Sequence, residues 1–297
     1  MKAITVFTPT FNRAYCLGNL YESLARQSND NFVWMVVDDG SSDDTKALVA
    51  SWIAESKVEI IYLFQQNQGM HGAHNTAYKN IKTDLNVCID SDDFMPDDAI
   101  EKILNFWNNN QQENWAGLIG LDAYTDGSIV GTAFPLDLKT CKSFQLKSKY
   151  GVVGDKKFVF RTDVITKYPE YPIFEGERFV PLNYKYLLID QDYDLGVMHD
   201  LLCIVEYMPD GSSRNIINQY KKNPQGFAFE RLVRMKHGYT LKERFKNAVH
   251  YVSSLLFQNK YNFLKYSTNK VLTFFAIPFG IALYLYLSNT NKKDWQK

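Results

Sequence analysis

The sequence predicts an α/β fold in which helices cover both faces of a doubly wound, mostly parallel sheet. Between residues 3 and 89, four short apolar runs alternate with segments that carry apolar residues at helical spacing, and this alternation is typical of parallel sheets. Two of the runs end in clustered acids, at Asp38-Asp39 and at Asp90–Asp93. With 297 residues, of which 45% are hydrophobic and 22% charged, the chain can bury one large core and carry an extension.

The expected elements follow from the apolar periodicity of each segment. The expected strands cover residues 3–8, 32–37, 58–64, 85–89, 154–161 and 203–207. The expected helices cover residues 15–27, a segment from a cap at Ser42 or Asp43 to about Glu55, and residues 73–81. The carboxyl ends of parallel strands point into the crevice where open α/β sheets bind ligands. We therefore expect the acids after the second and fourth strands at one edge of the sheet.

Three carboxylates follow the fourth expected strand: Asp90, Asp92 and Asp93. Clustered carboxylates repel one another unless a cation lies between them, and hard oxygen ligands suit Mg²⁺ or Mn²⁺. The residues Pro96–Asp98 indicate a helix start, which explains the acids after the cluster. A calcium loop is excluded, because Phe94 and Met95 stand where such a loop needs a carboxylate and a glycine. A metal site that holds a diphosphate and a solvated acidic turn remain as the two interpretations.

Four motifs within residues 1–100 together resemble one enzyme family. They occur in the family's order and spacing, and they are Thr8–Arg13, Val37–Thr45, Asn67–Gly69 with Ala73 and Asn75, and Asp90–Asp93. On these residues the chain resembles a family 2 glycosyltransferase of the GT-A fold, one of the inverting enzymes that build polysaccharides from nucleotide sugars. The resemblance implies a nucleotide-sugar-binding and catalytic GT-A domain in residues 1–215.

The resemblance also implies roles for the residues of these motifs. Those implied to bind the nucleotide sugar are Thr8, Pro9, Phe11, Arg13, Asp38, Asp39, Gly69, His71, Asn75, Asp90 and Ser91. Asp38 or Asp39 would accept hydrogen bonds from the base or the ribose, as a carboxylate at a strand end can. Met70 occupies a place where the family often has Lys, so His71 is the candidate to meet the diphosphate. Solvation in a loop is the alternative interpretation of His71 and His74.

A metal site and a general base are further implications of the resemblance. Asp92 would be the direct ligand of Mn²⁺ or Mg²⁺, with Asp90 as the second carboxylate. The metal would stabilise the departing diphosphate, while another carboxylate takes the proton of the attacking acceptor hydroxyl. Glu177 resembles that base, and Glu175 is the second candidate. The alternative is that both glutamates are exposed loop charges and that Glu177 pairs with Arg178.

A turn-rich loop at residues 209–215 follows the last expected strand. A flexible loop at this place can close over a donor and exclude water. Arg214 can then reach a phosphate oxygen of the nucleotide sugar. An exposed connecting loop is the alternative interpretation.

The C-terminal part of the chain is strongly basic, although the whole sequence is neutral. Residues 216–297 contain 14 Lys and Arg against 3 acids, a net charge of +11, and residues 1–215 carry −11. Thr240–Glu243 has the form of a capping box. Apolar residues follow it on one helical face: Leu241, Phe245, Ala248, Val249, Val252, Leu255 and Leu256. We therefore expect a basic helical extension at residues 216–297, whose charge indicates an interaction surface.

Val271–Leu287 is an apolar segment of seventeen uncharged residues within this extension. A bilayer span needs about 20 residues, and Pro278 and Gly280 interrupt this segment. Contact with a membrane surface or a re-entrant segment therefore fits better than a full span, and packing on protein is the alternative. The basic tail lacks a nucleic-acid-binding motif, so we expect no nucleic-acid partner.

The predicted function is metal-dependent, inverting transfer of a sugar. The donor is expected to be a nucleotide sugar, with UDP-sugar favoured, and the acceptor a hydroxyl group of a glycan or a lipid-linked glycan in the synthesis of a capsule, an O-antigen or a similar polysaccharide. Two alternatives stay open. Leu182 stands where many relatives have Glu, which favours a catalytically silent binding subunit of a membrane glycan assembly. A sugar nucleotidyltransferase is the less favoured alternative, because it would need a Gly-rich phosphate loop with a basic residue after the first strand and Pro9–Asn12 is not such a loop.

The location follows from the cysteines and the start of the chain. The four cysteines show no CxxC spacing, which is typical of reduced residues in a cytosolic protein. The first expected strand begins after two residues, which leaves no room for a signal peptide. We therefore expect a cytoplasmic protein that is peripheral at the inner face of the membrane.

Overall fold

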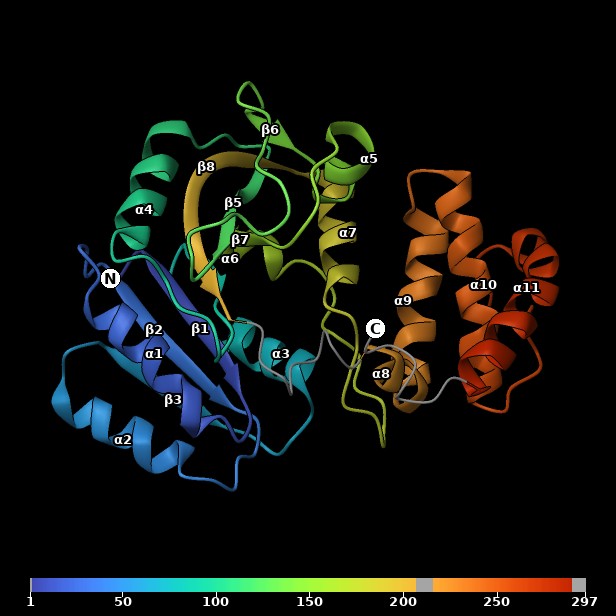
Figure 1. Cartoon of the computed structure of the whole chain (residues 1–297), viewed down its shortest axis with the longest axis horizontal. Coiled ribbons are helices and arrows are strands. Elements are labelled where there is room, and N and C mark those ends of the chain that lie inside the picture. Colours follow the sequence, from blue (N-terminus) through green and yellow to red (C-terminus); the bar gives the residue numbers. More distant parts are fainter. Residues whose placement is uncertain (1, 207–215, 290–297) are drawn as a thin grey trace. The chain divides into compact units, whose positions relative to one another are not determined.

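The computed structural model describes residues 2–206 and 216–289 and contains two compact units (Figure 1). The first unit comprises Met1–Tyr171 together with Leu188–Met208, and the second comprises Pro172–Leu187 together with Pro209–Lys297. The sequence predicted a single division between residues 215 and 216. The structure departs from it in one segment, because residues 172–187 group with the C-terminal helices.

The first unit is built on one eight-stranded sheet. Its strands are β1 Ile4–Thr10, β2 Phe32–Asp38, β3 Ile60–Phe64, β4 Leu85–Cys88, β5 Trp115–Tyr124, β6 Thr140–Cys141, β7 Lys156–Arg161 and β8 Asp194–Val205. They lie in the order β3-β2-β1-β4-β7-β5-β8-β6. Strands β1 to β4 pair in parallel, as do β5 and β8, whereas β7 runs antiparallel to both of its neighbours. The predicted fold class, an α/β fold with a mostly parallel sheet, is confirmed.

The helices fall into two groups along the chain. The first unit contains α1 Ala14–Ala25, α2 Thr45–Glu55, α3 Met70–Asn80, α4 Ala99–Asn110, the 3₁₀ turn η1 Ser143–Gln145, α5 Leu146–Tyr150 and α6 Thr162–Ile165. Helix α7, Asn183–Asp192, contains the passage from the second unit back to the first. The second unit continues with α8 Ile216–Lys222, α9 Pro224–His237, α10 Leu241–Phe257 and α11 Lys270–Asn289.

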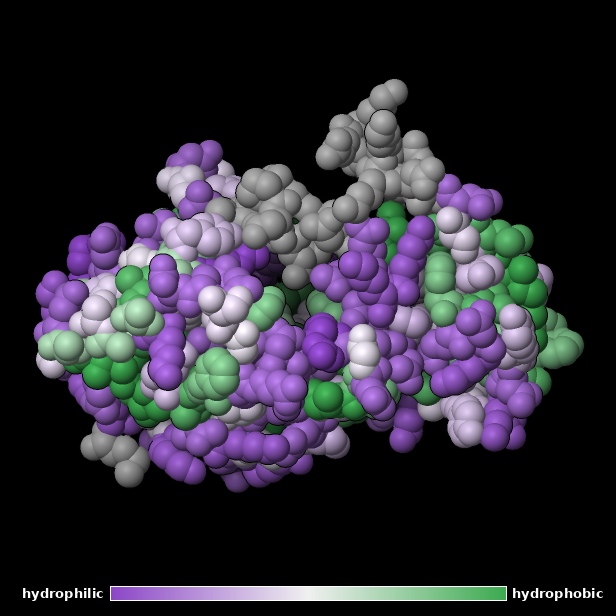
Figure 2. All heavy atoms as spheres, turned by 90° about the horizontal axis from the view of Figure 1, so that it is seen from below, coloured by the Kyte–Doolittle hydropathy of each residue, from purple (hydrophilic) through white to green (hydrophobic). Residues whose placement is uncertain are grey.

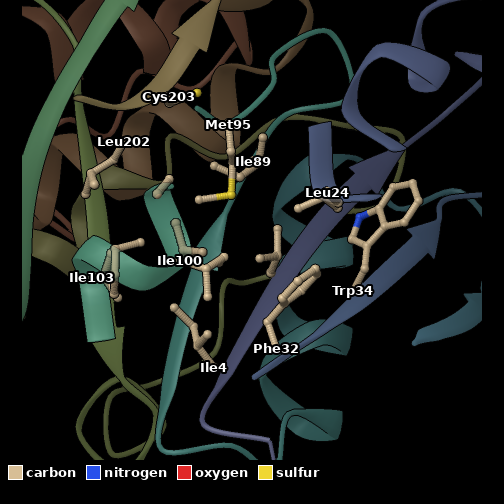
Figure 3. Packing of buried hydrophobic residues seen from close by; sticks show 14 of the residues in the cluster. Ile4, Leu24, Phe32, Trp34, Ile89, Met95, Ile100, Ile103, Leu202 and Cys203 are labelled. Carbon is tan, nitrogen blue, oxygen red and sulfur yellow. The ribbon is translucent and has the colours of Figure 1, made fainter. Parts of the chain in front are cut away.

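Both faces of the sheet are covered, as the prediction required. Successive side chains of a strand point to opposite faces. Val6 of β1 belongs to the buried cluster that also contains residues of α1, α2 and α4. The next residue, Phe7, packs against α3, with its ring centroid 5.0 Å from that of His74 and 5.5 Å from that of Tyr78. Figure 3 shows members of the first cluster drawn from two helices and the sheet: Leu24, Ile100, Ile103, Ile4 and Phe32.

Strands β5 and β8 are the main additions to the predicted fold. Of β8 the prediction covered only the last residues, and of β5 nothing. Gly117 of β5 has a φ of 151°, and a Cβ atom there would lie 2.0 Å from the carbonyl oxygen of Val159. This close approach of two strands requires glycine and interrupts the apolar run by which a buried strand is recognised.

The second unit is helical. Helices α9, α10 and α11 share one apolar cluster, which confirms the predicted face of α10 except for Leu241, which is exposed. Thr240 caps α10 as predicted, since its hydroxyl accepts a hydrogen bond from the Glu243 backbone N–H at 3.1 Å. The segment 172–187 joins this unit through Phe179, whose ring stacks on that of Phe227 at 5.4 Å between centroids.

Candidate active site

The predicted acids lie at the carboxyl ends of parallel strands. Asp38 is the last residue of β2, and Asp90 follows β4 after one residue. Strand β1 lies between these two strands and is parallel to both. The expectation that β2 and β4 end at the same edge of the sheet, each with a carboxylate at or just after its end, is therefore confirmed.

The loops after β1 and β2 are tied together by side-chain hydrogen bonds. The Asn12 amide oxygen accepts a bond from the Ser42 backbone N–H at 2.8 Å, and the Asn12 backbone N–H donates to the Ser41 hydroxyl at 2.9 Å. Asp43 accepts a bond from the backbone N–H of Ala14, in the first turn of α1, at 3.0 Å. Asn12 adopts a left-handed conformation with a φ of 53°, which Asn tolerates better than most residues. The two loops therefore form one pre-organised wall at this edge.

Asp38 and Asp39 hold the backbone of this edge. Asp38 is fully buried and accepts bonds from the Ser41 backbone N–H at 2.7 Å and from the Tyr62 hydroxyl at 2.6 Å. Burial and this bond to Asp38 raise the pKa of Tyr62. Asp39 accepts bonds from the backbone N–H groups of Gln68 and Gly69, at 2.8 and 2.7 Å. Asp39 also accepts a bond from the Gln65 side-chain amide at 2.7 Å, so the two acids together fix the loops after β2 and before α3.

The loop that Asp39 fixes leads into α3, where two predicted residues lie. Gly69 has a φ of 84° and immediately precedes the helix. His71 and His74 are buried within α3, so their interpretation as solvated loop residues was wrong. Asn75 forms a two-bond pair with the backbone of Tyr171, at 2.8 Å in both directions. The predicted ligand role of Asn75 is untested, and the structure assigns this amide an anchoring contact.

The residues predicted from β1 and its loop differ in accessibility. Thr8 is buried, and its hydroxyl accepts a bond from the Trp34 indole N–H at 3.0 Å. Pro9 is also buried in β1. By contrast, Phe11 is 46% exposed, and Arg13 is half-buried with its guanidinium 5.7 Å from the ring centroid of Tyr15. Phe11 and Arg13 are therefore the residues of this group that a ligand at the edge can contact.

The acids after β4 have two different environments. Asp90 and Asp92 are half-buried, whereas Ser91 and Asp93 are buried. One oxygen of Asp93 lies 3.8 Å from the Lys157 ammonium, and the other accepts a bond from the Glu206 backbone N–H at 3.3 Å. Burial raises the pKa of Asp93, and the charge of Lys157 opposes this.

The sequence analysis missed a charged group that is formed by Lys157 and Asp122 next to the acids after β4. Lys157 precedes the apolar part of β7, and burial alone would lower the pKa of this lysine. The charges of Asp122, Asp93 and Asp90 instead raise the pKa of Lys157 well above its usual value, so the ammonium stays charged. Asp122, in β5, is only 2% exposed, and its Oδ1 has no hydrogen-bond partner among the described residues. A charged residue within an apolar strand was the available sequence signal for both.

The donor set at this edge fits a metal ion that a ligand completes. Within residues 2–206 and 216–289 no group of three or more His, Cys, Asp and Glu residues could hold an ion by itself. Asp90 and Asp92 come from one turn and offer carboxylate oxygens. Mg²⁺ is commonly bound by about one or two carboxylates together with substrate phosphates. Burial raises the pKa of the Cys16 thiol. The charge of Arg13 lowers this pKa and the charge of Asp92 raises it, so Arg13 and Asp92 both lie near Cys16.

The two glutamates predicted as base candidates lie in the second unit. Glu177 is only 6% exposed, and its two oxygens accept bonds from the backbone N–H groups of Gln225 and Gly226, at 2.8 and 2.9 Å. These groups belong to the first turn of α9, so Glu177 caps this helix. The interpretation of Glu177 as an exposed loop charge was therefore wrong. Glu175 is exposed, and Arg214 lies outside the described residues.

Two solved structures with the same fold have been determined with nucleotide sugars. S. aureus TarS 1-349 in complex with UDP-GlcNAc has a TM-score of 0.62 at 14% identity, over 96% of this chain and 90% of that chain. Mannosyltransferase PcManGT from Pyrobaculum calidifontis, in complex with GDP-Man and Mn²⁺, has a TM-score of 0.51 at 16% identity, over 97% of this chain and 76% of that chain. These likenesses confirm the GT-A fold.

Curated relatives match the N-terminal part of the chain. An uncharacterized glycosyltransferase of Rickettsia felis is 30% identical over 147 residues, which are 46% of this chain and 24% of that protein. The GalNAc(5)-diNAcBac-PP-undecaprenol beta-1,3-glucosyltransferase of Campylobacter jejuni is 30% identical over 168 residues, 56% of this chain and 53% of that protein. The chain thus spans about a quarter of the first and about half of the second. The sequence model of Glycosyl transferase family 2 matches residues 5–165, more than half of the chain, and the chain belongs to this family.

Proposed function

We propose that this protein is a metal-dependent, inverting glycosyltransferase that moves a sugar from a UDP-sugar to a hydroxyl group of a glycan or lipid-linked acceptor. The observation that carries the proposal is the edge formed by the carboxyl ends of β1, β2 and β4. There a pre-organised pair of loops and the half-buried acids Asp90 and Asp92 occur together. Membership of Glycosyl transferase family 2 supports the same class of reaction.

The donor would bind along this edge. Phe11 offers an exposed ring for contact with the base, and Arg13 offers a cation for the diphosphate. Asp38 or Asp39 would accept hydrogen bonds from the base or ribose, which is the role that the family resemblance implies for a carboxylate at a strand end. The structural relative from S. aureus binds UDP-GlcNAc, which supports a UDP-sugar as the donor. Thr8 and Pro9, which are buried in β1, would shape the nucleotide pocket from behind these residues. The roles of Gly69, His71, Asn75, Ser91 and Arg214 in donor binding belong to the same proposal.

Asp92 and Asp90 would hold the metal ion. When bound, Mn²⁺ or Mg²⁺ supplies positive charge for the diphosphate that leaves the sugar. The buried Lys157 ammonium lies beside Asp93 and keeps part of the acid cluster neutralised. The structural relative from Pyrobaculum calidifontis contains Mn²⁺, which favours an ion of this class.

A carboxylate would act as the general base. As the acceptor oxygen attacks the anomeric carbon, the bond from that carbon to the diphosphate oxygen breaks and the hydroxyl proton passes to the carboxylate. Glu177 and Glu175 are the candidates. Glu177 accepts two backbone bonds from the first turn of α9, and Glu175 is exposed. A single test therefore has to separate a base from a helix cap.

The acceptor and the location form the outer part of the proposal. The relative from Campylobacter jejuni acts, by its name, on an undecaprenol-linked glycan, and another from Escherichia coli is named chondroitin synthase. An acceptor of the lipid-linked class would place this protein at the inner face of a membrane, in polysaccharide synthesis such as that of a capsule or an O-antigen. Helix α11 is long and apolar enough to cross a bilayer by length and composition, and we propose that it contacts the membrane surface.

The test is the release of free nucleoside diphosphate from a panel of nucleotide sugars, with Asp92→Asn as the variant. Asp97→Asn is the matched control, because it makes the same change at an exposed acid that pairs with Arg26. We expect Mn²⁺ to strengthen UDP binding to the wild type and to the control, as measured by calorimetry, and Asp92→Asn to lose both this effect and UDP release. Metal-independent UDP binding in the wild type would refute the metal site. Absence of any diphosphate release across the panel would refute the transferase.

A further inference from the structure

Helix α11 has one packed side and one exposed apolar side. Ala276, Gly280 and Leu287 are buried on the packed side. The exposed residues of the helix include Val271, Phe274, Phe275, Phe279, Ile281, Leu285 and Tyr286. At about 100° per residue, these seven positions fall on one side of the helix and cover about half of its circumference. Figure 2 shows hydrophobic residues, in green, gathered at the right-hand end of the view, where α11 lies in Figure 1.

An exposed surface of this kind indicates contact with another apolar phase. Exposed side chains of a soluble helix are mostly polar, whereas residues 271–288 carry no charge. Phe274 and Phe275 are 60% and 62% exposed. Contiguous apolar surface of more than a few hundred square ångströms is rare on monomeric proteins unless it binds a partner or a membrane.

A cavity of about 520 Å³ lies at the connection between α10 and α11. Its lining residues are Leu255, Lys260, Tyr261, Asn262, Lys265 and Tyr266. The volume falls within the roughly 300–1,000 Å³ that ligand pockets occupy. The cavity therefore combines two exposed ammonium groups and two phenol rings with the buried Leu255, and its lining contains no acid.

The basic groups of this cavity converge on one phenol. The Lys265 ammonium lies 4.9 Å from the ring centroid of Tyr266. A hydrogen bond with Lys265, together with its charge and that of Lys260, lowers the pKa of Tyr266. Lys260 donates to the side-chain oxygen of Gln258 at 2.9 Å, which holds its ammonium near the loop.

The charge of the surrounding segment is uncompensated. Residues 258–289 contain three lysines, at 260, 265 and 270, and no acid. Within residues 216–289 the acids are Glu230 and Glu243. Glu230 pairs with Arg231 at 3.1 Å, and the Glu243 carboxylate lies 3.5 Å from the Arg234 guanidinium. Neither acid lines the cavity, so this end of α11 favours an anionic ligand.

We propose that the cavity lined by Lys260 and Lys265 binds the phosphate headgroup of an anionic lipid, while the exposed side of α11 lies among the acyl chains. The inference rests on the proposed function, which places the acceptor at a membrane, and it specifies the site of attachment. Lysines near an anionic leaflet attract its phosphates, and tyrosine is enriched at the interface between lipid and water. Tyr261 is 70% exposed, so its ring can lie at this interface. An apolar surface next to a basic cavity therefore matches an anionic membrane surface in both charge and polarity.

The test is the binding of the full-length protein to vesicles in a flotation assay without any sugar donor. One set of vesicles contains phosphatidylcholine alone, and the other contains equal parts of phosphatidylcholine and phosphatidylglycerol. The test variant is Lys260→Gln/Lys265→Gln. The matched control is Lys242→Gln/Lys246→Gln, which removes the same charge from exposed lysines of α10. A third variant, Phe274→Ser/Phe275→Ser, tests the apolar side of α11.

We expect the wild type to bind the anionic vesicles more tightly than the neutral ones. Because each lysine near an anionic leaflet contributes about a five-fold change in affinity, the Lys260/Lys265 variant should bind about 30-fold more weakly and the control pair clearly less so. The phenylalanine variant should lose the binding that persists at high salt. Equal losses in the two lysine pairs would overturn the headgroup site.

A concentration-dependent dimer in sedimentation that the phenylalanine variant abolishes would also overturn the proposal, because a second copy would then cover α11. The melting temperature of each variant shows that it is folded. Release of UDP from the donor, measured without vesicles, should be unchanged in the lysine variants. UDP release without vesicles depends on the transferase proposal and not on the headgroup site. A failure of the transferase proposal is therefore distinguishable from a failure of the headgroup site.

Discussion

Replacing Glu177 by glutamine separates a structural role from a catalytic one. In the protein both carboxylate oxygens accept backbone bonds from the first turn of α9, at 2.8 and 2.9 Å. An amide can accept only one of these bonds and turns its NH₂ group toward the other N–H. Losing one bond to a charged group costs about 1.5–3 kcal/mol, and losing the negative charge at a helix N-terminus costs about 0.3–1 kcal/mol more. We expect a loss of about 2–4 kcal/mol in the stability of the second unit.

The assay for this variant has two readouts and a matched control. Denaturant unfolding reports stability, and turnover per folded molecule reports catalysis. If Glu177 is the base, turnover should fall by about 100-fold or more, and Glu175→Gln, the same change at an exposed position two residues away, should leave both readouts unchanged. Unchanged stability in Glu177→Gln would refute the cap. Normal turnover of the folded variant would refute the base and leave Glu175 as the candidate to examine.

Three further changes test other parts of the structure. Lys157→Met leaves buried carboxylates uncompensated and should destabilise the first unit by about 3–5 kcal/mol in urea unfolding; a variant as stable as the wild type would contradict the buried charge cluster. Asp39→Asn removes the acceptor of the backbone N–H groups that fix the loop before α3, and UDP affinity should fall by about 10-fold in calorimetry because such bonds contribute about 1.5–3 kcal/mol. Burial, with the charges of Arg231 and Lys246, lowers the pKa of His250 to about 4. Since the unfolded value is about 6.5, this histidine stabilises the second unit above pH 6.5, and up to about 3 kcal/mol is lost as the pH falls toward 4. His250→Gln should remove this part of the pH dependence of unfolding.

The elements that the sequence predicted well are those with a local signal. The strands β1, β2 and β4 are short, mostly apolar runs, and the acids at the ends of β2 and β4 are visible by position alone. Strand β5 was missed because Gly117, Gly120 and Asp122 break its apolar run. Each of these residues lies close to a residue of a neighbouring strand. Gly120 faces Leu202 of β8, where a Cβ atom would lie 2.4 Å from a methyl group. Strands that are distant in the sequence determine which residues fit at these positions, so no local sequence pattern predicts them.

The same limit explains the glutamates. Glu177 contacts the backbone of α9 across 48 and 49 residues of sequence, and only the folded second unit reveals that contact. Its motif was recognised by resemblance, which carries a role but not a set of partners. The structure therefore changed the question from whether Glu177 is an exposed charge to whether a helix cap can also accept a proton.

The acids of the first unit divide into two kinds, and this division favours the proposed chemistry. Asp38, Asp39 and Asp43 accept bonds that hold loops and helix starts in place, and Asp93 is buried beside Lys157. A diphosphate pocket benefits from such acids, because they fix its loops before the anion binds. Rearranging the loops on binding would cost free energy. Asp90 and Asp92 stay half-buried at the same edge. A pair of carboxylates with access to solvent is repulsive by itself and becomes favourable when a cation and a diphosphate join it. The proposed function therefore predicts that donor and ion bind together at this edge, and UDP affinity that depends on Mn²⁺ is its most direct test.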